Sequence, residues 1–166
     1  DDVESRGLGD VYKRQGLGFD CALQVVNSAL MVKSGDESLA TLDIICIDLF
    51  TGIADLMKAG AAATYIKKDG VVQRVDFSSL PVGILTDVKL EHRTLRLGND
   101  DWVLMVSDGA VVSGDSWIMD IMKHWKSGSA QEMAQVIITE AKENRNDNYD
   151  DDVTAIAMNF MSNIKD

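Results

Sequence analysis

The chain has 166 residues, 46% of them hydrophobic, and its 27 acidic and 16 basic residues give a formal net charge of −11. This length and apolar content suit one domain with its own core. The acidic excess argues against nucleic acid or an anionic membrane face as a partner, because both are negatively charged. No run of about 18 apolar residues occurs, so the sequence predicts no membrane span.

The N-terminal stretch differs from the rest of the chain. Residues 1–15 are polar and lack periodicity, and we interpret them as an extraneous or disordered tail that precedes a domain over residues 16–166. After Asp20, apolar residues recur at helical spacing and predict a helix over about Cys21–Val32. Gly35 and Asp36 then end this pattern.

Most of the middle of the chain reads as short strands joined by tight turns. Asp69-Gly70 is a strong hairpin signal between two of these strands. The expected strands are Thr41–Phe50, Ile53–Ala59, Ala63–Lys67, Val71–Val75, Val88–Leu97 and Trp102–Ser107.

Two helices and a final strand complete the predicted order. Apolar residues between Trp117 and Trp125 mark the first helix, and Ser129 opens "SAQE", a capping-box pattern, before the second. The last expected strand is Val153–Phe160. Successive strands with short turns are antiparallel neighbours, and helices grouped together indicate an α+β fold with layered sheets and helices.

Two acid–strand junctions are the candidate site. In "VLMVSDGAVV", the apolar run Val103–Val106 leads to Asp108, and an aspartate there is costly unless it is paired, hydrogen-bonded or bound to a metal. In "NDNYDDDVTAIAM", a cluster of aspartates precedes the last strand: Asp147, Asp150, Asp151 and Asp152. Oxygen-only ligands favour Mg²⁺, Mn²⁺ or Ca²⁺ over Zn²⁺. From the residues alone, a solvated acidic loop and an ordinary Asp-Gly turn compete with the metal interpretation.

Two further aspartates lie within the first strand-like run. Asp43 and Asp48 are an odd number of positions apart, so they face opposite sides of a strand. One is expected to face solvent or a partner and the other to be satisfied inside, and we interpret both as structural.

Together these motifs resemble a known family. "GFDCALQVVNSALMVKS", "ATLDIICIDLFTG", "KAGAAATYIKKDG", "SSLPVGIL", "VSDG" and "DDDVTAIAM" occur in the order seen in the metal-dependent PP2C-type (PPM) protein phosphatases. The sequence is most similar to the phosphatase domain of the stage II sporulation protein E type, over about Leu17–Phe160. The resemblance implies a PP2C-like β-sandwich of antiparallel sheets flanked by helices, with the first strands missing.

The resemblance also implies a site and a reaction. Asp108 and Asp151 match family ligands of a Mn²⁺ or Mg²⁺ pair, with Gly109, Asp152 and Thr154 beside them. A metal-bound water would attack a phosphoserine in line, so no protein nucleophile is expected. The family's upstream "DG-x-G" metal motif finds no match, which predicts that this fragment is inactive although the full-length protein is an enzyme.

The partner and the location follow from the same resemblance. The implied substrate is a phosphorylated anti-sigma-factor antagonist whose dephosphorylation activates a sporulation sigma factor. The implied place is the cytoplasmic face of a membrane-anchored protein in a spore-forming bacterium, with the anchor upstream, and a homo-oligomer is a further expectation. Two other hypotheses remain open: a non-catalytic pseudophosphatase or regulatory domain, and a generic acidic cation-binding module.

Overall fold

A computed structural model of the chain describes residues 27–29, 40–84, 91–144 and 151–161. The predicted tail over residues 1–15 lies outside the described residues, as does most of the helix expected over Cys21–Val32, of which residues 27–29 are helical. The described strands are β1 (Leu42–Ile47), β2 (Ile53–Ala59), β3 (Thr64–Lys68), β4 (Val71–Val75), β5 (Glu91–Arg96), β6 (Trp102–Val106) and β7 (Ala155–Asn159). The helical elements are η1 (Asp108–Ala110), α3 (Ser116–His124) and α4 (Ala130–Glu143).

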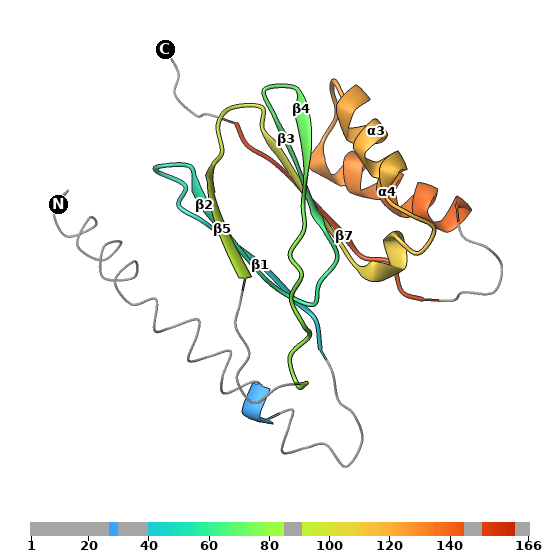
Figure 1. The fold of residues 1–166 in the computed structure, drawn as a ribbon. Helices are drawn as coiled ribbons and strands as arrows, with labels where there is room; N and C mark the ends of the chain where they lie inside the picture. Colours follow the sequence, from blue (N-terminus) through green and yellow to red (C-terminus); the bar gives the residue numbers. More distant parts are fainter. Residues whose placement is uncertain (1–26, 30–39, 85–90, 145–150, 162–166) are drawn as a thin grey trace, which may run out of the picture.

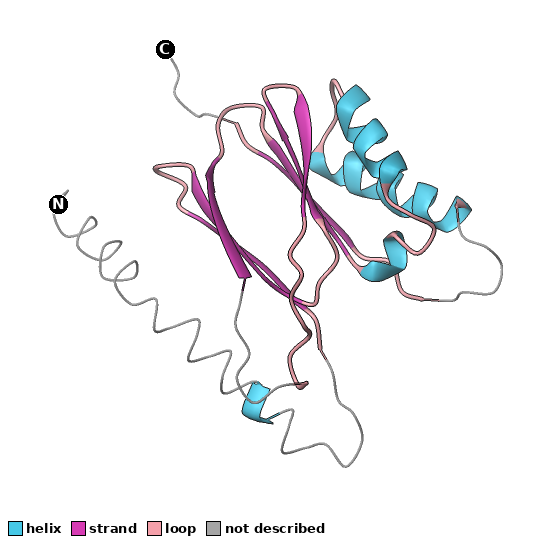
Figure 2. Ribbon diagram, viewed as in Figure 1, coloured by secondary structure: helices cyan, strands magenta, loops and turns pink. Residues whose placement is uncertain are grey.

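The described strands form two antiparallel sheets. One has the order β1-β2-β5 and the other the order β4-β3-β6-β7. Figure 1 shows the two sheets as separate layers, with α3 and α4 on the outer side of the four-stranded sheet, and Figure 2 shows the same layering by secondary structure. This arrangement confirms the predicted α+β sandwich of antiparallel sheets flanked by helices.

Two apolar cores lie on the two faces of the four-stranded sheet. Between the sheets, Leu56 packs with Val103 in one cluster of buried residues. On the other face, Leu104 packs with Ile118 of α3 and Ile137 of α4. Strand β6 contributes to both cores, so all of its side chains are buried. This explains why its sequence is an unbroken apolar run, since a strand covered on both faces does not alternate.

The first strand ends earlier than the sequence predicts. We expected a strand over Thr41–Phe50, but β1 stops at Ile47. The Asp48 carboxylate accepts hydrogen bonds from the backbone N–H groups of Phe50 (2.9 Å) and Thr51 (3.2 Å), which closes a turn. Leu49 and Phe50 are almost fully exposed at this hairpin tip, so apolar side chains there extended the strand-like pattern beyond the paired backbone.

Helix α4 begins with the capping box that the sequence predicts. The Ser129 hydroxyl accepts a hydrogen bond from the Glu132 backbone N–H (3.1 Å), and the Glu132 carboxylate accepts one from the Ser129 N–H (2.7 Å). These bonds satisfy two donors that a helix start otherwise leaves unpaired. No helix in the described part of the chain is both long enough and apolar enough to cross a membrane.

Replacing Ser129 with Ala is therefore expected to lower the free energy of unfolding by about 1 kcal/mol. Urea unfolding followed by circular dichroism measures this change. Ser127, outside the cap, provides the matched serine-to-alanine control, and we expect it to change stability by less than about 0.5 kcal/mol. Equal effects of the two substitutions would show that the cap contributes nothing specific.

Candidate metal centre

The two acid–strand junctions meet in the structure. β6 and β7 are antiparallel neighbours, and Val106 lies opposite Ala155 at their junction ends. Beyond this pair, the Ser107 N–H donates to the Thr154 carbonyl (3.0 Å), and the Thr154 N–H donates to the Ser107 hydroxyl oxygen (2.9 Å). The Ser107 hydroxyl also donates to the Asp152 carbonyl (3.2 Å). Ser107 therefore fixes the loop that carries the second group of acids beside the first.

Asp108 is exposed at the end of this well-anchored strand. It opens η1, whose other residues, Gly109 and Ala110, are buried. The Asp108 carboxylate accepts a hydrogen bond from the Gly109 N–H (3.1 Å). The buried pair holds the backbone in place, so the carboxylate is presented from a fixed position.

The second junction carries two more carboxylates in the loop that Ser107 holds beside the end of β6. Asp151 and Asp152 are both exposed, and the Asp151 carboxylate accepts a hydrogen bond from the Asp152 N–H (2.9 Å). Asp147 and Asp150 lie outside the described residues. The structure brings the Asp151 loop beside Asp108, and the role of each as a metal ligand stays a prediction.

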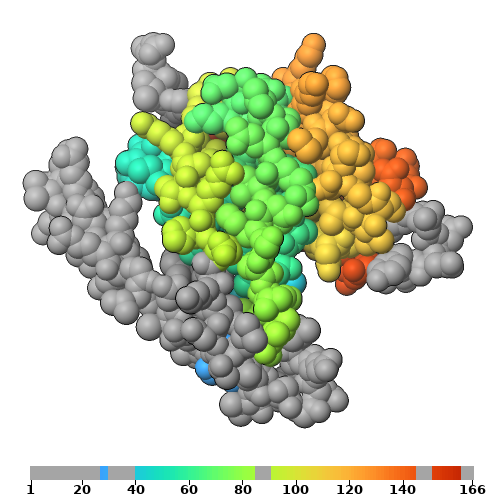
Figure 3. Space-filling view, in the orientation of Figure 1, coloured from blue at the N-terminus to red at the C-terminus, as the bar shows by residue number. Residues whose placement is uncertain are grey.

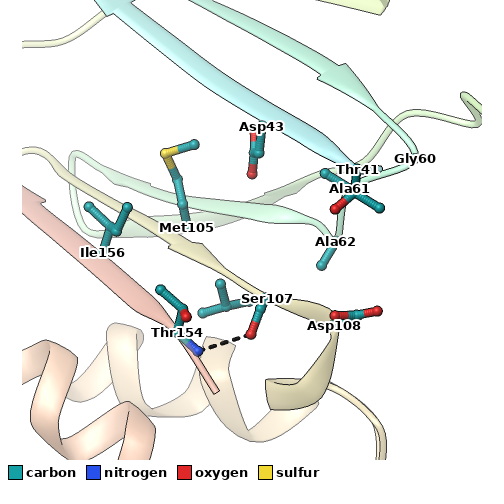
Figure 4. Close-up of a pocket in the computed structure, with 11 residues that line it drawn as sticks. Thr41, Asp43, Gly60, Ala61, Ala62, Met105, Ser107, Asp108, Thr154 and Ile156 are labelled. Atoms are coloured by element: carbon teal, nitrogen blue, oxygen red, sulfur yellow. Dashed lines mark hydrogen bonds between the residues drawn. The ribbon is translucent and has the colours of Figure 1, made fainter. Parts of the chain in front are cut away.

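A cavity of about 220 Å³ opens beside these junctions. Ser107, Asp108 and Thr154 line one side of it, and Asp43 of β1 lies across from them (Figure 4). The remaining lining residues come from the strand ends and the β2–β3 connection: Thr41, Gly60, Ala61, Ala62, Met105, Val106 and Ile156. The cavity therefore lies between the two sheets, at the side where β1 and β7 are the outer strands.

Asp43 joins the two sheets at this cavity. Its Oδ2 atom accepts from Lys58 Nζ at 2.5 Å and from the Thr64 hydroxyl at 3.3 Å, so it contacts both β2 and β3. Lys58 is fully buried and also donates to the Ala62 carbonyl (2.6 Å). Burial lowers the pKa of Lys58, and the hydrogen bond and charge of Asp43 oppose that shift.

These contacts test the interpretation of Asp43 and Asp48. Asp43 faces inward and is satisfied by Lys58, as expected for one of the two. Asp48 lies beyond the end of β1 and caps the turn, so strand alternation does not decide where it faces. Sequence reasoning missed that Asp43 lines the same cavity as Asp108. No local signal shows this, because the two residues belong to different sheets.

The cavity wall also depends on a close backbone approach. Gly60 has φ +64°, and a Cβ atom there would lie 2.5 Å from Pro81 Cγ. The Gly60 N–H donates to the Ser79 hydroxyl (3.2 Å), which donates in turn to the Lys58 carbonyl (3.3 Å). The "SSLPVGIL" segment therefore supports the cavity wall.

The carboxylates of the two junctions fit a hard divalent cation in their chemistry, and of these Asp108 lines the cavity. Asp108, Asp151 and Asp152 offer only carboxylate oxygens, the ligands that Mn²⁺ and Mg²⁺ prefer. Asp43 Oδ1 is buried without a hydrogen-bond partner, so this side of the cavity holds an acceptor oxygen that no described donor satisfies. Within the described ranges, however, no group of three or more His, Cys, Asp or Glu side chains converges as a metal cluster. These carboxylates would hold the ion together with water or further ligands.

Comparison with known proteins assigns the family. The sequence model of the family described as stage II sporulation protein E (SpoIIE) matches residues 4–161. The chain belongs to the stage II sporulation protein E family. It is 30% identical over 154 residues to stage II sporulation protein E of Bacillus subtilis, covering 89% of this chain and 19% of that protein. For the Priestia megaterium protein the identity is 25%, and the match covers 89% and 26%. The chain thus spans about a fifth to a quarter of these relatives.

Solved structures place the chain within the phosphatase part of the family. It superposes on the phosphatase domain of SpoIIE from Bacillus subtilis with a TM-score of 0.69 at 29% identity, covering 98% of this chain and 74% of that one. A structure of that PP2C domain with a fragment of the regulatory domain gives 0.74 at 29% identity, covering 95% and 49%. A PPM Ser-Thr phosphatase from Mycobacterium smegmatis gives 0.66 at 16% identity, covering 96% and 80%, which shows a shared fold alone. The resemblance to PP2C-type phosphatases of the SpoIIE type is confirmed.

Proposed function

We propose that the chain is part of a metal-dependent protein serine phosphatase. The observation that carries this proposal is the meeting of the Asp108 and Asp151 junctions beside a cavity, on a sandwich shared with phosphatase domains of the family. A carboxylate that lines a cavity, with further carboxylates in the adjoining loop, suits a divalent cation that binds a phosphoryl group. Family membership makes phosphoryl transfer to water the preferred chemistry.

Each residue of the site has a distinct task under this proposal. Asp108 and Asp151 hold Mn²⁺ or Mg²⁺, which when bound supplies an activated water and offsets negative charge at the phosphoryl group. Gly109 fixes the Asp108 carboxylate through its N–H. Asp152 and Thr154 bond to Ser107 through their backbones and keep the two junctions at a constant spacing.

The substrate and the setting are finer parts of the proposal. We infer that the full-length protein removes phosphate from a phosphoserine of an anti-sigma-factor antagonist and so activates a sporulation sigma factor. The names of the relatives support a sporulation role. We further propose a cytoplasmic domain on a membrane-anchored protein that self-associates.

The isolated chain is expected to have no appreciable phosphatase activity. Its described carboxylates do not gather into a cluster of three or more, and a hard cation with few protein ligands binds weakly. Phosphate release from a phosphoserine peptide with Mn²⁺ is measured for this chain and for the full-length protein in parallel. The assay tests whether the chain is inactive and whether the full-length protein is a phosphatase. Robust turnover by the chain would show that its metal site is sufficient. No turnover by the full-length protein would favour a pseudophosphatase.

A further inference from the structure

A second cavity, of about 190 Å³, lies at the opposite side of the sandwich from Asp108. It opens between the β3–β4 hairpin and β5, where β4 and β5 are the outer strands of their sheets. Figure 3 shows the surface of β5 beside that of the β3–β4 hairpin on one face of the molecule. The lining residues are Ile66, Lys68, Gln73, Arg93, Leu95 and Arg96.

Cationic and polar side chains occupy positions here that face the inside of the sandwich. Arg93 lies opposite Leu56, whose side chain is fully buried between the sheets. Lys68 follows the buried Ile66 by two positions and so shares its face, and Gln73 lies opposite Ile66 on β4. Arg93 and Gln73 are exposed and Lys68 is half-buried, whereas the neighbouring Leu56 and Ile66 are buried, so these polar side chains lie where the inter-sheet core meets solvent.

These cations have no carboxylate partner in the described part of the chain. The ion pairs found there involve Lys58 and Arg74, and no acidic residue lines the cavity. Lys68 Nζ donates to the Arg96 carbonyl (2.6 Å), which holds the ammonium group at the cavity. Glu91 shares a face of β5 with Arg93 but does not line the cavity. The cavity therefore concentrates positive charge in a chain whose net charge is −11.

We propose that this cavity is a binding site for a phosphate group. Guanidinium groups bind phosphate through paired, charge-assisted hydrogen bonds, and Lys68 adds a point charge. Arg96 alternates with the inward-facing Leu95 and contributes its backbone carbonyl, so the cations at the cavity are Arg93 and Lys68. Two positive charges suit a doubly charged phosphate better than a singly charged carboxylate. The volume is below the roughly 300 Å³ at which sites for drug-sized ligands begin, so a small ion fits it best. The phosphate comes either from a phosphorylated protein side chain or from free phosphate.

Protection of the sheet edges is the competing structural explanation. Inward-facing charges on outer strands discourage pairing with another chain. β5 is an outer strand, so Arg93 suits that role. Edge protection predicts self-association when the charges are removed and makes no demand for phosphate binding.

Titration of the ¹⁵N-labelled chain with inorganic phosphate, followed by NMR chemical shifts, tests the site. We expect shifts centred on β3, β4 and β5, and none with acetate at the same ionic strength. Arg93→Gln and Lys68→Gln should each raise the Kd for phosphate about tenfold, since each removes a charged hydrogen-bond donor. Arg93→Lys should retain part of the affinity. Lys126→Gln, the same charge loss in an exposed loop between α3 and α4, should leave the Kd within about twofold.

Several results would overturn the phosphate site. One is a set of chemical-shift changes spread over the whole surface. Another is a Kd for phosphate that rises as much with Lys126→Gln as with Arg93→Gln. The third is an unchanged Kd for phosphate in a folded Arg93→Gln protein. Self-association of Arg93→Gln with unchanged phosphate binding would establish edge protection instead. The titration measures phosphate binding itself, so an absence of phosphatase activity would not contradict the phosphate site.

A phosphoserine peptide and its unphosphorylated form identify the source of the phosphate. Tighter binding of the phosphopeptide than of inorganic phosphate supports a docking site for a phosphorylated protein. Equal or weaker binding supports a site for free phosphate. Binding of the unphosphorylated peptide as tight as that of the phosphopeptide would count against any phosphate site.

Discussion

Asp108→Asn in the full-length protein is expected to lower kcat/KM for a phosphoserine peptide by about 100-fold or more. Removing an indirect partner of a bound metal already costs about 10- to 100-fold, and Asp108 is proposed to contact the ion itself. Asparagine keeps the size of the side chain and an acceptor oxygen but loses the negative charge that attracts a hard cation. Steady-state phosphate release at saturating Mn²⁺ measures the loss.

The matched control is Asp100→Asn in the turn before the same strand. Asp100 is exposed and has φ +63°, a backbone conformation that asparagine also tolerates. We expect activity within about twofold of the unmodified protein, because asparagine can still accept the hydrogen bond from Asn99 and only a surface charge away from the site is lost. Calorimetric titration with Mn²⁺ provides a readout that is independent of turnover, and Asp108→Asn should weaken binding there as well. Full activity and full Mn²⁺ affinity in a folded Asp108→Asn protein would contradict the proposed site.

Lys58→Met is expected to lower the free energy of unfolding by about 3–5 kcal/mol. The Lys58 side chain is fully buried, and its ammonium group is the cation that pairs with Asp43. Removing one partner of a buried ion pair leaves the other charge in a poorly solvated place, and such losses are typically of this size. A domain is usually stable by only about 5–15 kcal/mol, so the change is a large fraction of the total. Urea unfolding followed by the fluorescence of Trp102 and Trp125, which pack edge-on in the core, measures it.

The double replacement Asp43→Leu with Lys58→Met distinguishes two causes of the lost stability: the missing ion-pair contact and the unpaired charge left on Asp43. Replacing both partners by apolar residues of similar volume is often neutral or stabilising. We therefore expect the double variant to recover most of the stability that Lys58→Met loses. Lys126→Met at an exposed position is the control for the loss of a lysine and should change stability by less than about 0.5 kcal/mol. A double variant as unstable as Lys58→Met would show that the pair itself stabilises the fold.

Local chemistry predicted several elements well. Asp69-Gly70 is the hairpin turn between β3 and β4, and both residues have positive φ (49° and 77°), as such a turn requires. The capping box at Ser129 forms as "SAQE" indicates. Each of these features depends on residues within a few positions of one another, so the sequence contains the whole cause. The Leu49-Phe50 tip shows the limit of that reasoning. Its apolar side chains predicted a longer strand, but the backbone there pairs with no neighbouring strand.

The sequence predicted only part of the candidate site. The motifs selected Asp108 and Asp151, which are 43 positions apart, but whether they meet depended on β6 and β7 lying side by side. The Asp43–Lys58 pair was half visible, because an aspartate within an apolar strand needs a partner but the sequence does not identify that partner. The Arg93 cavity gave no sequence signal at all.

The sequence by itself therefore determined the family, the order of the elements, the turns and caps, and which carboxylates end or begin apolar strands. Tertiary structure alone decided how the strands divide between two sheets, and so which side chains share a cavity. The physical reason is the range of the interactions. Turns and caps are closed by bonds within a few residues, whereas strand pairing and burial join segments far apart in the chain. Only the packing of the two sheets sets Asp43 across from Asp108 and brings Arg93 and Lys68 to one cavity.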